Sequence, residues 1–394
     1  MSVAKSNNIR SVTILGSTGS IGCKTIDLIE LNPERFSVDV LVANCNAEKL
    51  AEQAKRLNPH LVVVAQNEAY LPLKEALFGY NIEVASGSGA VIDATRRPTD
   101  FVMAAIIGAI GLESTLVAIQ RGAIVGLANK EALVCAGSLM MTEVERCHAT
   151  LIPVDSEHSA IFQVLDVENY DSVDRIILTA SGGPFRTFDI EQMMSIIPED
   201  AIVNPNWSMG AKTSVDSATM MNKGLELIEA HNLFGLAEDR IDILIHPQSI
   251  IHSMVSYIDG SILAHLGMPD MQIPISLALG WPKRMSTLSK KLDLSKIATL
   301  TFEAPDPVRF PALCLARNVL RKGGVAPTIF NASNEISVGA FLEGRIGFLD
   351  IVRLVEQVVD KLGDAPLDAF SDIYLYDNQA RQMTKDLVAK FAHK

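Results

Sequence analysis

Strand-length apolar runs and amphipathic helical stretches alternate along the first part of the chain. Residues 12–15, 36–42 and 61–64 are continuously or alternately apolar over the length of a strand. Stretches of helical period lie between them, one ending near Leu31 and the next beginning at Glu48. Such alternation is typical of a parallel sheet with right-handed crossovers. Further buried strands at 101–107 and 123–127, with a helix over 112–120, extend the prediction to a doubly wound domain.

The pattern changes in the second half of the chain. Strand candidates at 175–179 and 241–245 enclose a polar region with many short motifs. Periodicity is weak over 282–307 and becomes helical over 312–322, 335–343 and 349–362. The predicted fold is therefore α/β. It comprises an N-terminal doubly wound, Rossmann-like nucleotide domain (1–154), a central α/β catalytic domain (155–281), a linker (282–308) and a C-terminal helical bundle domain (309–394).

Composition narrows the classes of protein to which the chain can belong. Hydrophobic residues make up 48% and charged residues 20%, which describes a packed globular protein. A net charge of −12 argues against general nucleic-acid binding. Five scattered cysteines without a Cys-x-x-Cys spacing are predicted to be free thiols. The longest uncharged apolar stretch, 101–112, is too short to span a bilayer, and the N-terminus lacks a signal-peptide pattern, so we expect a cytoplasmic protein without a membrane segment.

A glycine-rich turn follows the first predicted strand. It reads Gly16-Ser-Thr-Gly-Ser-Ile-Gly22 and opens the first helix. Free amides at a helix N-terminus bind phosphates, so this turn predicts a dinucleotide pyrophosphate site, although the spacing is not the commonest fingerprint. Its residues Thr18, Gly19, Ser20 and Ile21 are candidate cofactor contacts.

The end of the second strand bears on the choice of cofactor. An acid there hydrogen-bonds a free ribose 2′-hydroxyl, whereas a basic residue accepts a 2′-phosphate. This chain has Asn44-Cys45-Asn46, with neither an acid nor a cation, and Lys49 one turn further on. The absent acid favours NADP over NAD.

Two carboxylates lie two residues apart in Pro153-Val-Asp155-Ser-Glu157-His158. If this segment is extended, both side chains face the same side. Oxygen ligands of this kind suit Mg²⁺ or Mn²⁺, and Glu226 is a third candidate. The alternative interpretation is a solvated strand end with ordinary acids.

The third candidate carboxylate, Glu226, lies in a central region of the sequence that is rich in hydroxyl, amide and cationic residues. Ser181 stands in a Ser-Gly-Gly-Pro turn, and the segment containing Trp207 has the composition of a lid. Helical periodicity over 217–229 places Asn222 and Glu226 on one face, with Lys223 beside them. A phosphate site next to a metal carboxylate is the predicted arrangement. The alternatives are a plain surface turn and an amphipathic helix with solvated polar residues.

Other polar residues have weaker signals. His246 and His265 are expected to be core or hydrogen-bonded histidines rather than ligands. Lys130 follows the fifth predicted strand at its carboxyl end, where ligands bind in such sheets, so it either holds substrate or pairs with Glu131.

Seven motifs in sequence order closely resemble the 1-deoxy-D-xylulose 5-phosphate reductoisomerase family. They are Gly16-Ser-Thr-Gly-Ser-Ile-Gly22, Leu127-Ala-Asn-Lys-Glu131, Pro153-Val-Asp-Ser-Glu-His158, Ala180-Ser-Gly-Gly-Pro-Phe185, Pro205-Asn-Trp-Ser-Met-Gly210, Ser217-Ala-Thr-Met-Met-Asn-Lys-Gly-Leu-Glu226 and His246-Pro-Gln-Ser249. The resemblance continues into the helical end at Phe310-Pro-Ala-Leu and Asn331-Ala-Ser-Asn-Glu335.

The resemblance implies an NADPH- and divalent-metal-dependent enzyme, usually a homodimer, that makes 2-C-methyl-D-erythritol 4-phosphate for non-mevalonate isoprenoid biosynthesis. It implies a phosphorylated sugar substrate, rearranged with metal assistance and then reduced by hydride. The implied metal ligands are Asp155, Glu157 and Glu226. The implied substrate contacts are Lys130, Ser156, Glu157, Ser181, Asn204, Trp207, Ser217, Asn222, Lys223 and Glu226. The implied cofactor contacts are Thr18, Gly19, Ser20, Ile21, Asn44, Cys45, Asn46, Asn129, Glu131 and Gly210. The implied catalytic residues are Lys130, Asp155, Glu157 and Glu226.

The chain departs from the family pattern twice. Asn204 stands where the family usually has a histidine, and Asn44-Cys45-Asn46 replaces a segment that usually carries a cation. Two other classes are weighed beside the family: a metal-independent semialdehyde or homoserine-type dehydrogenase, and a non-catalytic nucleotide sensor. Neither class would need the three carboxylates together.

Overall fold

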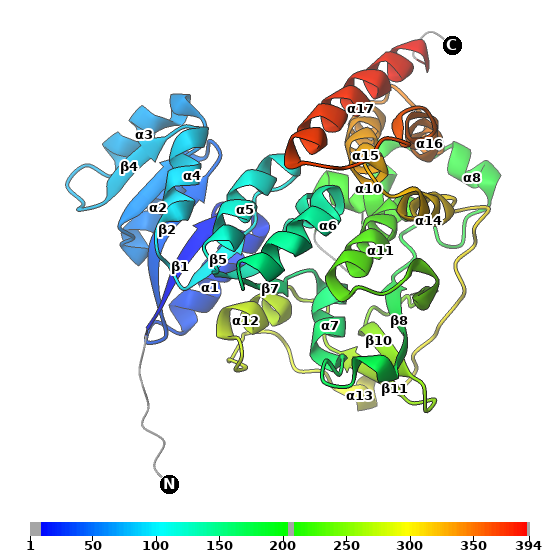
Figure 1. The fold of residues 1–394 in the computed structure, drawn as a ribbon, viewed down its shortest axis with the longest axis horizontal. Helices are drawn as coiled ribbons and strands as arrows, with labels where there is room; N and C mark the ends of the chain where they lie inside the picture. The colour runs from blue at the N-terminus through cyan, green and yellow to red at the C-terminus, as the bar shows by residue number, and fades with distance from the viewer. Residues whose placement is uncertain (1–8, 204–208, 392–394) are drawn as a thin grey trace. The chain divides into compact units, whose positions relative to one another are not determined.

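The computed structural model describes residues 9–203 and 209–391. Its chain divides into two compact units. Unit 1 consists of Met1–Ala132, Met140–Ser159 and Met271–Ser289, and unit 2 of Leu133–Leu139, Ala160–Asp270 and Lys290–Lys394. Each unit has its own sheet (Figure 1).

Unit 1 is built on a seven-stranded parallel sheet in the order β4-β3-β2-β1-β5-β6-β7. The chain winds outward from β1 in one direction and then resumes at β5 on its other side, so the strand order switches between β1 and β5. Ligands bind at such a switch point, outside the carboxyl ends of the strands. The strands are β1 (Arg10–Leu15), β2 (Phe36–Ala43), β3 (Leu61–Val64), β4 (Glu83–Ser86), β5 (Phe101–Ala104), β6 (Ile124–Leu127) and β7 (Thr150–Pro153).

Helices connect and cover this sheet. Those within unit 1 are α1 (Ser20–Leu31), α2 (Ala47–Leu57), α3 (Tyr70–Ala76), α4 (Ser88–Arg96), α5 (Leu112–Gln120) and α12 (Gln272–Gly280). Although α12 comes from far along the chain, it packs on α1, β6 and β7. Arg10 fixes its end by donating to the carbonyls of Leu279 (2.6 Å) and Trp281 (2.7 Å).

Two further helices include residues of both units. They are α6 (Lys130–Arg146) and α7 (Ser156–Val164). The helical backbone of α6 breaks at Gly137, whose φ is 22°. An added Cβ there would lie 2.9 Å from the side-chain amide of Asn232, so the position requires glycine.

Unit 2 contains a four-stranded mixed sheet in the order β11-β10-β8-β9. Its strands are β8 (Val173–Ala180), β9 (Ile241–Ile245), β10 (Ile251–Tyr257) and β11 (Ile262–Leu266). β8 runs parallel to β9 and antiparallel to β10. The parallel pair brings the carboxyl ends of β8 and β9 to one edge.

The helices of unit 2 bury one continuous apolar core with the sheet. They are α8 (Ile190–Met194), α9 (Pro198–Ala201), α10 (Ala211–Thr219), α11 (Met221–Phe234), α14 (Ala312–Lys322), α15 (Ala326–Leu342), α16 (Asp350–Leu362) and α17 (Phe370–Phe391). The short α13 (Leu294–Ile297) has no buried residue and lies outside this core. α15 packs against α16 and α17, which Figure 1 shows as neighbouring orange and red helices. Buried Phe330 and Phe341 place α15 at the centre of this bundle.

The predicted α/β fold with a helical C-terminal region is confirmed, with local corrections. The predicted strand over 101–107 ends at Ala104, and β4 was missed because its half-exposed sequence Glu-Val-Ala-Ser has no apolar run. The strand before Lys130 is therefore the sixth, not the fifth. The helix predicted over 217–229 is two helices, because Met220 adopts a left-handed φ of 64°.

The predicted linker region is mostly irregular, with only the short α13 inside it. The boundaries of the three predicted domains remain a prediction, because the two units are defined by their internal contacts and not by function. None of the helices in 9–203 or 209–391 has the length and apolarity needed to cross a bilayer.

Candidate active site

The glycine turn of unit 1 depends on two glycines for its shape. Gly16 has a φ of 85°, and a Cβ on it would lie 2.5 Å from the Ala105 carbonyl oxygen. A Cβ on Gly22 would lie 2.3 Å from the Gly16 carbonyl oxygen. Gly19 is the N-cap of α1 and provides no side-chain capping bond. The first-turn amides of α1 are thus left for an anion, which fits the predicted pyrophosphate site.

Candidate residues follow the neighbouring strands at the same edge of the unit 1 sheet. Asn129, after β6, caps α6 by accepting from the Ala132 amide (3.0 Å). Its side-chain amide donates to the Gly108 carbonyl (2.9 Å), which ties the loop after β5 to the start of α6. Glu131 follows in the first turn of α6 and is buried. The turn after β1 and the residues after β5 and β6 therefore share one edge.

Lys130 and Asp155 form an ion pair at this edge. Their side chains are 18% and 14% exposed, so the pair is largely removed from water. Lys130 thus contacts Asp155 in addition to standing next to Glu131. Ser156 donates to the Glu157 carboxylate (2.7 Å).

The route that brings the two acids together differs from the predicted one. β7 ends at Pro153, and α7 begins at Ser156, so the segment is not extended. Asp155 instead precedes the helix, where its carbonyl accepts from the Ser159 amide (2.8 Å). The two carboxylates interact across the helix start. The prediction of an extended segment over 151–157 was therefore wrong.

The surroundings of Asp155 keep its carboxylate ionised. Burial alone would raise the pKa of Asp155, but the Lys130 ammonium, His158 and the interaction with Glu157 outweigh burial and hold the pKa well below its usual range. An ionised carboxylate is what a divalent cation requires as a ligand. His158, which is fully buried, was not recognised from the sequence as part of this cluster.

In unit 2, the turn after β8 packs against α10. Gly182 and Gly183 both have positive φ, at 83° and 70°. A Cβ on Gly183 would lie 2.9 Å from the Ser217 carbonyl oxygen, so the backbone of this turn touches the end of α10. Ser181 and Ser217, which are 36 residues apart in the sequence, are in this way brought to one region.

A pocket of about 440 Å³ opens beside this turn. Arg186 contributes to its lining and pairs with Glu303 at 2.6 Å. The other lining residues are Ser181, Gly183, Pro184, Thr187, Val203 and Pro247. The pocket is large enough for a small phosphorylated molecule, and sequence reasoning missed Arg186, which no motif singled out.

The start of α11 gathers an amide and an ammonium around one carboxylate. Both the Asn222 amide and the Lys223 ammonium donate to Glu226. Lys223 is 4% and Glu226 1% exposed. The predicted shared face of Asn222 and Glu226 is present, but Ser217 lies on α10, beyond the corner at Met220.

The histidines of unit 2 mostly serve the fold. His246 stacks on Phe302, its Nδ1 lies 2.9 Å from the Thr301 carbonyl oxygen, and its Nε2 accepts from the Ile250 amide. Both ring nitrogens are hydrogen-bonded and the side chain is buried, so the prediction of a core, hydrogen-bonded histidine is confirmed for His246. His252 and His265 lie with their ring centroids 5.7 Å apart.

Buried acids beyond the predicted set lie on α10 and α11. Asp216 is 1% exposed, accepts from the Asn334 amide (2.8 Å) and pairs with Lys212 (2.9 Å). Glu229 is also 1% exposed and follows Glu226 by three residues. The i, i+3 spacing to Glu226 was a usable signal for Glu229, and the i, i+4 spacing to Lys212 was one for Asp216. The amide partner of Asp216, Asn334, is 118 residues away and gave no local signal.

Comparison with known proteins decides the family. A profile described as 1-deoxy-D-xylulose 5-phosphate reductoisomerase matches residues 12–137, and two profiles of the family's C-terminal domains match 151–234 and 266–383. A relative from Rhodospirillum centenum, named 1-deoxy-D-xylulose 5-phosphate reductoisomerase, is 58% identical over 97% of this chain and 95% of its own. The chain belongs to the 1-deoxy-D-xylulose 5-phosphate reductoisomerase family.

Other relatives agree. A reductoisomerase from Zymomonas mobilis is 54% identical over 94% of this chain and 96% of its own. A solved structure of the Zymomonas mobilis reductoisomerase in complex with NADPH superposes with a TM-score of 0.92 at 51% identity, covering 96% of this chain and 98% of that one. A reductoisomerase complex with NADPH, fosmidomycin and magnesium gives 0.92 at 38% identity, covering 97% and 98%. The resemblance drawn from seven motifs is confirmed.

Three of the predicted site residues fall in the segment 204–210. The predictions for Asn204 and Trp207 fall outside the described residues. Gly210 is the N-cap of α10 and is exposed, and, apart from its neighbours in the chain, none of the described residues lies within 4 Å of the position that a Cβ would take. The conformation of Gly210 therefore does not itself demand glycine.

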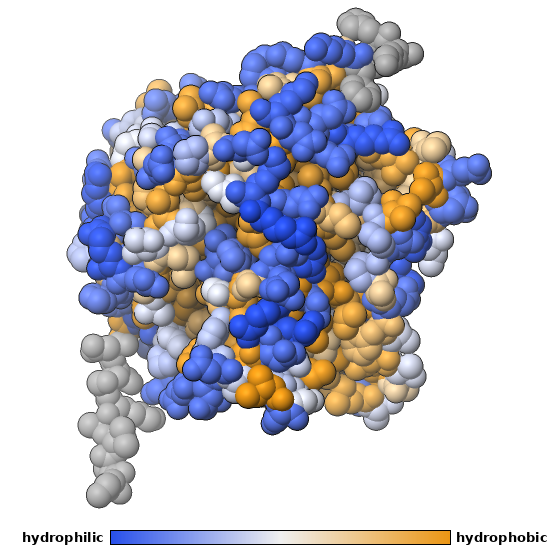
Figure 2. Space-filling model, turned by 45° about the vertical axis from the view of Figure 1, so that its right-hand side comes forward, coloured by the Kyte–Doolittle hydropathy of each residue, from blue (hydrophilic) through white to orange (hydrophobic). Residues whose placement is uncertain are grey.

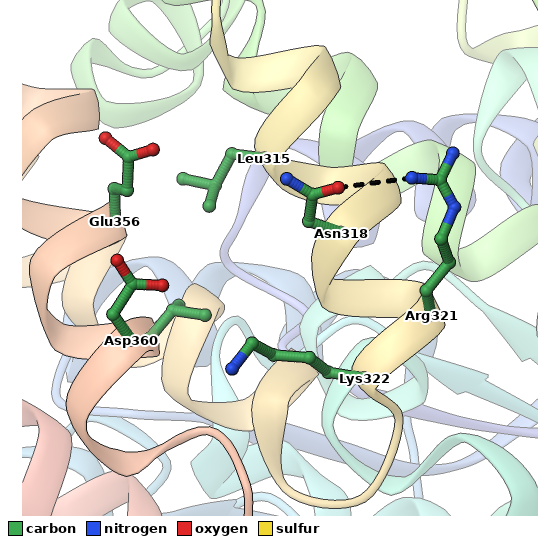
Figure 3. A pocket seen from close by; sticks show the side chains of 7 residues that line it. Leu315, Asn318, Arg321, Lys322, Glu356 and Asp360 are labelled. Atoms are coloured by element: carbon green, nitrogen blue, oxygen red, sulfur yellow. Dashed lines mark hydrogen bonds between the residues drawn. The ribbon is translucent and has the colours of Figure 1, made fainter.

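A second pocket, of about 360 Å³, lies between α14 and α16 (Figure 3). Its cations already have partners. Arg321 donates to Asn318 (3.2 Å) and pairs with Glu238, and Lys322 pairs with Asp364 (2.7 Å). Because these charges are compensated within the protein, we assign this pocket no ligand.

Proposed function

We propose that the chain converts 1-deoxy-D-xylulose 5-phosphate to 2-C-methyl-D-erythritol 4-phosphate, using NADPH and a divalent metal, in non-mevalonate isoprenoid precursor biosynthesis. Family membership over nearly the whole chain is the observation that carries this proposal. The solved relatives with NADPH and with magnesium support the cofactors. The glycine turn, its uncapped helix start and the ionised Asp155 fit those cofactors on this chain's own residues.

The proposed metal ligands are Asp155, Glu157 and Glu226. When bound, the ion supplies Lewis-acid polarisation of the substrate's carbonyl and hydroxyl oxygens, and NADPH supplies the hydride. Two lysines pair with these proposed ligands: Lys130 with Asp155 and Lys223 with Glu226. Each ammonium compensates the negative charge of its carboxylate. The proposed catalytic set is these three acids with Lys130.

Substrate contacts are proposed for two groups of residues, one for the phosphate and one for the carbon chain of the sugar. Lys223 carries a positive charge in a largely buried position, and its neighbour Asn222 adds amide hydrogens for a phosphate. Lys130, Ser156 and Glu157 would hold the polar carbon chain of the sugar. The other proposed contacts are Ser181, Asn204, Trp207, Ser217 and Glu226.

The cofactor would lie along the carboxyl edge of the unit 1 sheet. The start of α1 would hold its pyrophosphate through backbone amides, and Asn129 would keep the neighbouring loop in place. Water exclusion is proposed for the segment containing Trp207. The full proposed set of cofactor contacts is Thr18, Gly19, Ser20, Ile21, Asn44, Cys45, Asn46, Asn129, Glu131 and Gly210.

We also propose a homodimer that works in the cytoplasm. β11 is an edge strand of the unit 2 sheet and carries exposed Ile262 (54%) and Leu263 (50%), which are features of a surface that pairs with another chain. Apolar side chains reach the surface in several places, as the orange areas of Figure 2 show. All five cysteines are free thiols, which suits a reducing compartment.

Oxidation of NADPH in the presence of 1-deoxy-D-xylulose 5-phosphate tests the function directly. We expect turnover that stops when the divalent metal is chelated and resumes when Mg²⁺ or Mn²⁺ returns. Asp155→Asn should abolish this turnover while NADPH binding persists. Metal-independent turnover of a semialdehyde would favour the dehydrogenase hypothesis, and NADPH binding without turnover of any sugar phosphate would favour a sensor.

A further inference from the structure

One lysine of unit 1 reaches from the second βα connection to the glycine turn. Lys49 lies in the first turn of α2, and its ammonium donates to the Thr18 carbonyl at 3.1 Å. The side chain of Asn46, the N-cap of α2, accepts from the Lys49 amide at 3.0 Å and so fixes the backbone beneath it. The Lys49 charge therefore lies where the ends of β1 and β2 come together.

In dinucleotide-binding domains, residues at the end of the second strand contact the 2′-position of the adenosine ribose. Asn44, Cys45 and Asn46 are exposed there and carry no charge. Across the described segments 16–22 and 44–50, Lys49 is the sole cationic side chain. A 2′-phosphate placed between these segments would have one ammonium within reach, together with the N-terminus of α2.

The neighbouring residue Glu48 would favour NADH instead of NADPH. Glu48 is also in the first turn of α2 and could accept a hydrogen bond from a free 2′-hydroxyl, as NADH would offer. It is Lys49, however, whose side chain bonds to the glycine turn. The Thr18 carbonyl is also within reach of the Cys23 thiol (3.6 Å), so this oxygen keeps a donor when the ammonium turns to a phosphate.

We propose that Lys49 is the specificity-determining residue for the 2′-phosphate of NADPH in this chain. The ammonium exchanges its bond to Thr18 for an ion pair with the phosphate. The proposal rests on the proposed use of NADPH and adds the residue that separates NADPH from NADH.

Equilibrium binding of two small probes tests this without catalysis. Adenosine 2′,5′-bisphosphate and adenosine 5′-monophosphate differ by the 2′-phosphate alone, and calorimetric titration gives the affinity of each. In Lys49→Met we expect the affinity for the bisphosphate to fall about 10- to 100-fold while that for the monophosphate is unchanged. The dissociation constant of NADPH should rise by a similar factor and that of NADH should stay constant.

Matched variants separate recognition from local folding. Lys49→Arg should retain most of the preference, and Lys55→Met, which alters a lysine in the last turn of the same helix, should leave both probes unaffected. Equal losses for both probes in Lys49→Met, no loss for either, or a wild-type protein that does not distinguish the probes would each overturn the proposal. Because no sugar phosphate is present, a failure of the proposed reaction would leave this result standing.

Discussion

The two units form their candidate sites from different materials. In unit 1 the cofactor region is chiefly backbone: a turn that only glycine can make at Gly16 and Gly22, and helix amides that no side chain caps. In unit 2 the substrate region is chiefly buried charge, with Lys223 and Glu226 together at the start of α11. The first should therefore be sensitive to added volume and the second to altered charge.

The difference extends to how each region is supported. Asn129 secures the unit 1 edge through two hydrogen bonds to backbone groups. The unit 2 region rests on a second buried acid, Asp216, held by an amide from α15. A site made of buried ions requires every partner to be present, because an ion left alone in the interior is costly.

The largest effect is expected from Glu226→Gln. Removing this charge leaves Lys223 buried without its anion and removes a proposed metal ligand, so turnover should fall about 1,000-fold or more. Steady-state kinetics over a range of Mg²⁺ concentrations would measure the loss, with NADPH binding as the test of folding. Glu238→Gln, which alters another paired acid of unit 2, is the control and should keep turnover. Near-normal turnover in Glu226→Gln would contradict the charge-based view of unit 2.

Asp216→Ala should destabilise the protein without touching the proposed ligands. The Asn334 amide, which is fully buried, would lose its acceptor, at a cost of about 2–3 kcal/mol in the free energy of unfolding. Denaturant unfolding measures this value, and Asp216→Asn, which keeps an oxygen acceptor, should lose less. Equal stability of the alanine variant and the wild type would show that this buried acid does not support α10.

Gly22→Ala tests the backbone character of unit 1. Its methyl group would press on the Gly16 carbonyl oxygen, so NADPH affinity should fall about 10- to 100-fold through displacement of the turn. Gly89→Ala, in the first turn of α4, is the control and should keep its affinity, since a Cβ there would meet no described atom outside its own helix within 4 Å. NADPH fluorescence titration compares the two. If both variants bind equally well, the tight turn does not set the affinity.

The smallest effect concerns His252. Burial, together with the neighbouring His265, lowers the pKa of His252 to about 4, despite hydrogen bonds to the carbonyls of Met268 and Gly267 that act in the opposite sense. The unfolded chain binds a proton near pH 6.5, so the neutral ring stabilises the fold fully above that pH, and the stabilisation is lost as the pH falls toward 4.

Unfolding at pH 7 and at pH 5 measures this contribution. The wild type should lose on the order of 1–2 kcal/mol through His252 over this interval, and His252→Gln should lose that much less. An identical pH dependence in the two proteins would remove His252 as a source of acid sensitivity.

Much of the fold was readable where periodicity is strong. β3, β9, α5 and α14 occupy the predicted positions because each is a clean apolar run or a clean helical stripe. The half-exposed β4 gave no such signal. The left-handed Met220 was also unreadable, since nothing in Thr-Met-Met distinguishes a corner from a continuing helix.

The site was predictable where partners are close in sequence. The shared face of Asn222 and Glu226 follows from helical spacing. The pairing of Asp155 with Lys130 and of Asp216 with Asn334 depends on folding segments 25 and 118 residues apart, which no local pattern encodes. Motif order identified the family, but contacts between remote segments required coordinates.

The placement of α12 has a consequence for how the chain folds while it is being synthesised. Residues 271–289 complete unit 1, and α12 buries its apolar side chains in part against β6 and β7. A nascent chain that has emerged only as far as residue 154 leaves that flank of the sheet uncovered. A truncated fragment of unit 1 that lacks residues 271–289 would expose the same apolar surface. Fusing residues 271–289 to such a fragment through a short flexible tether should restore its solubility.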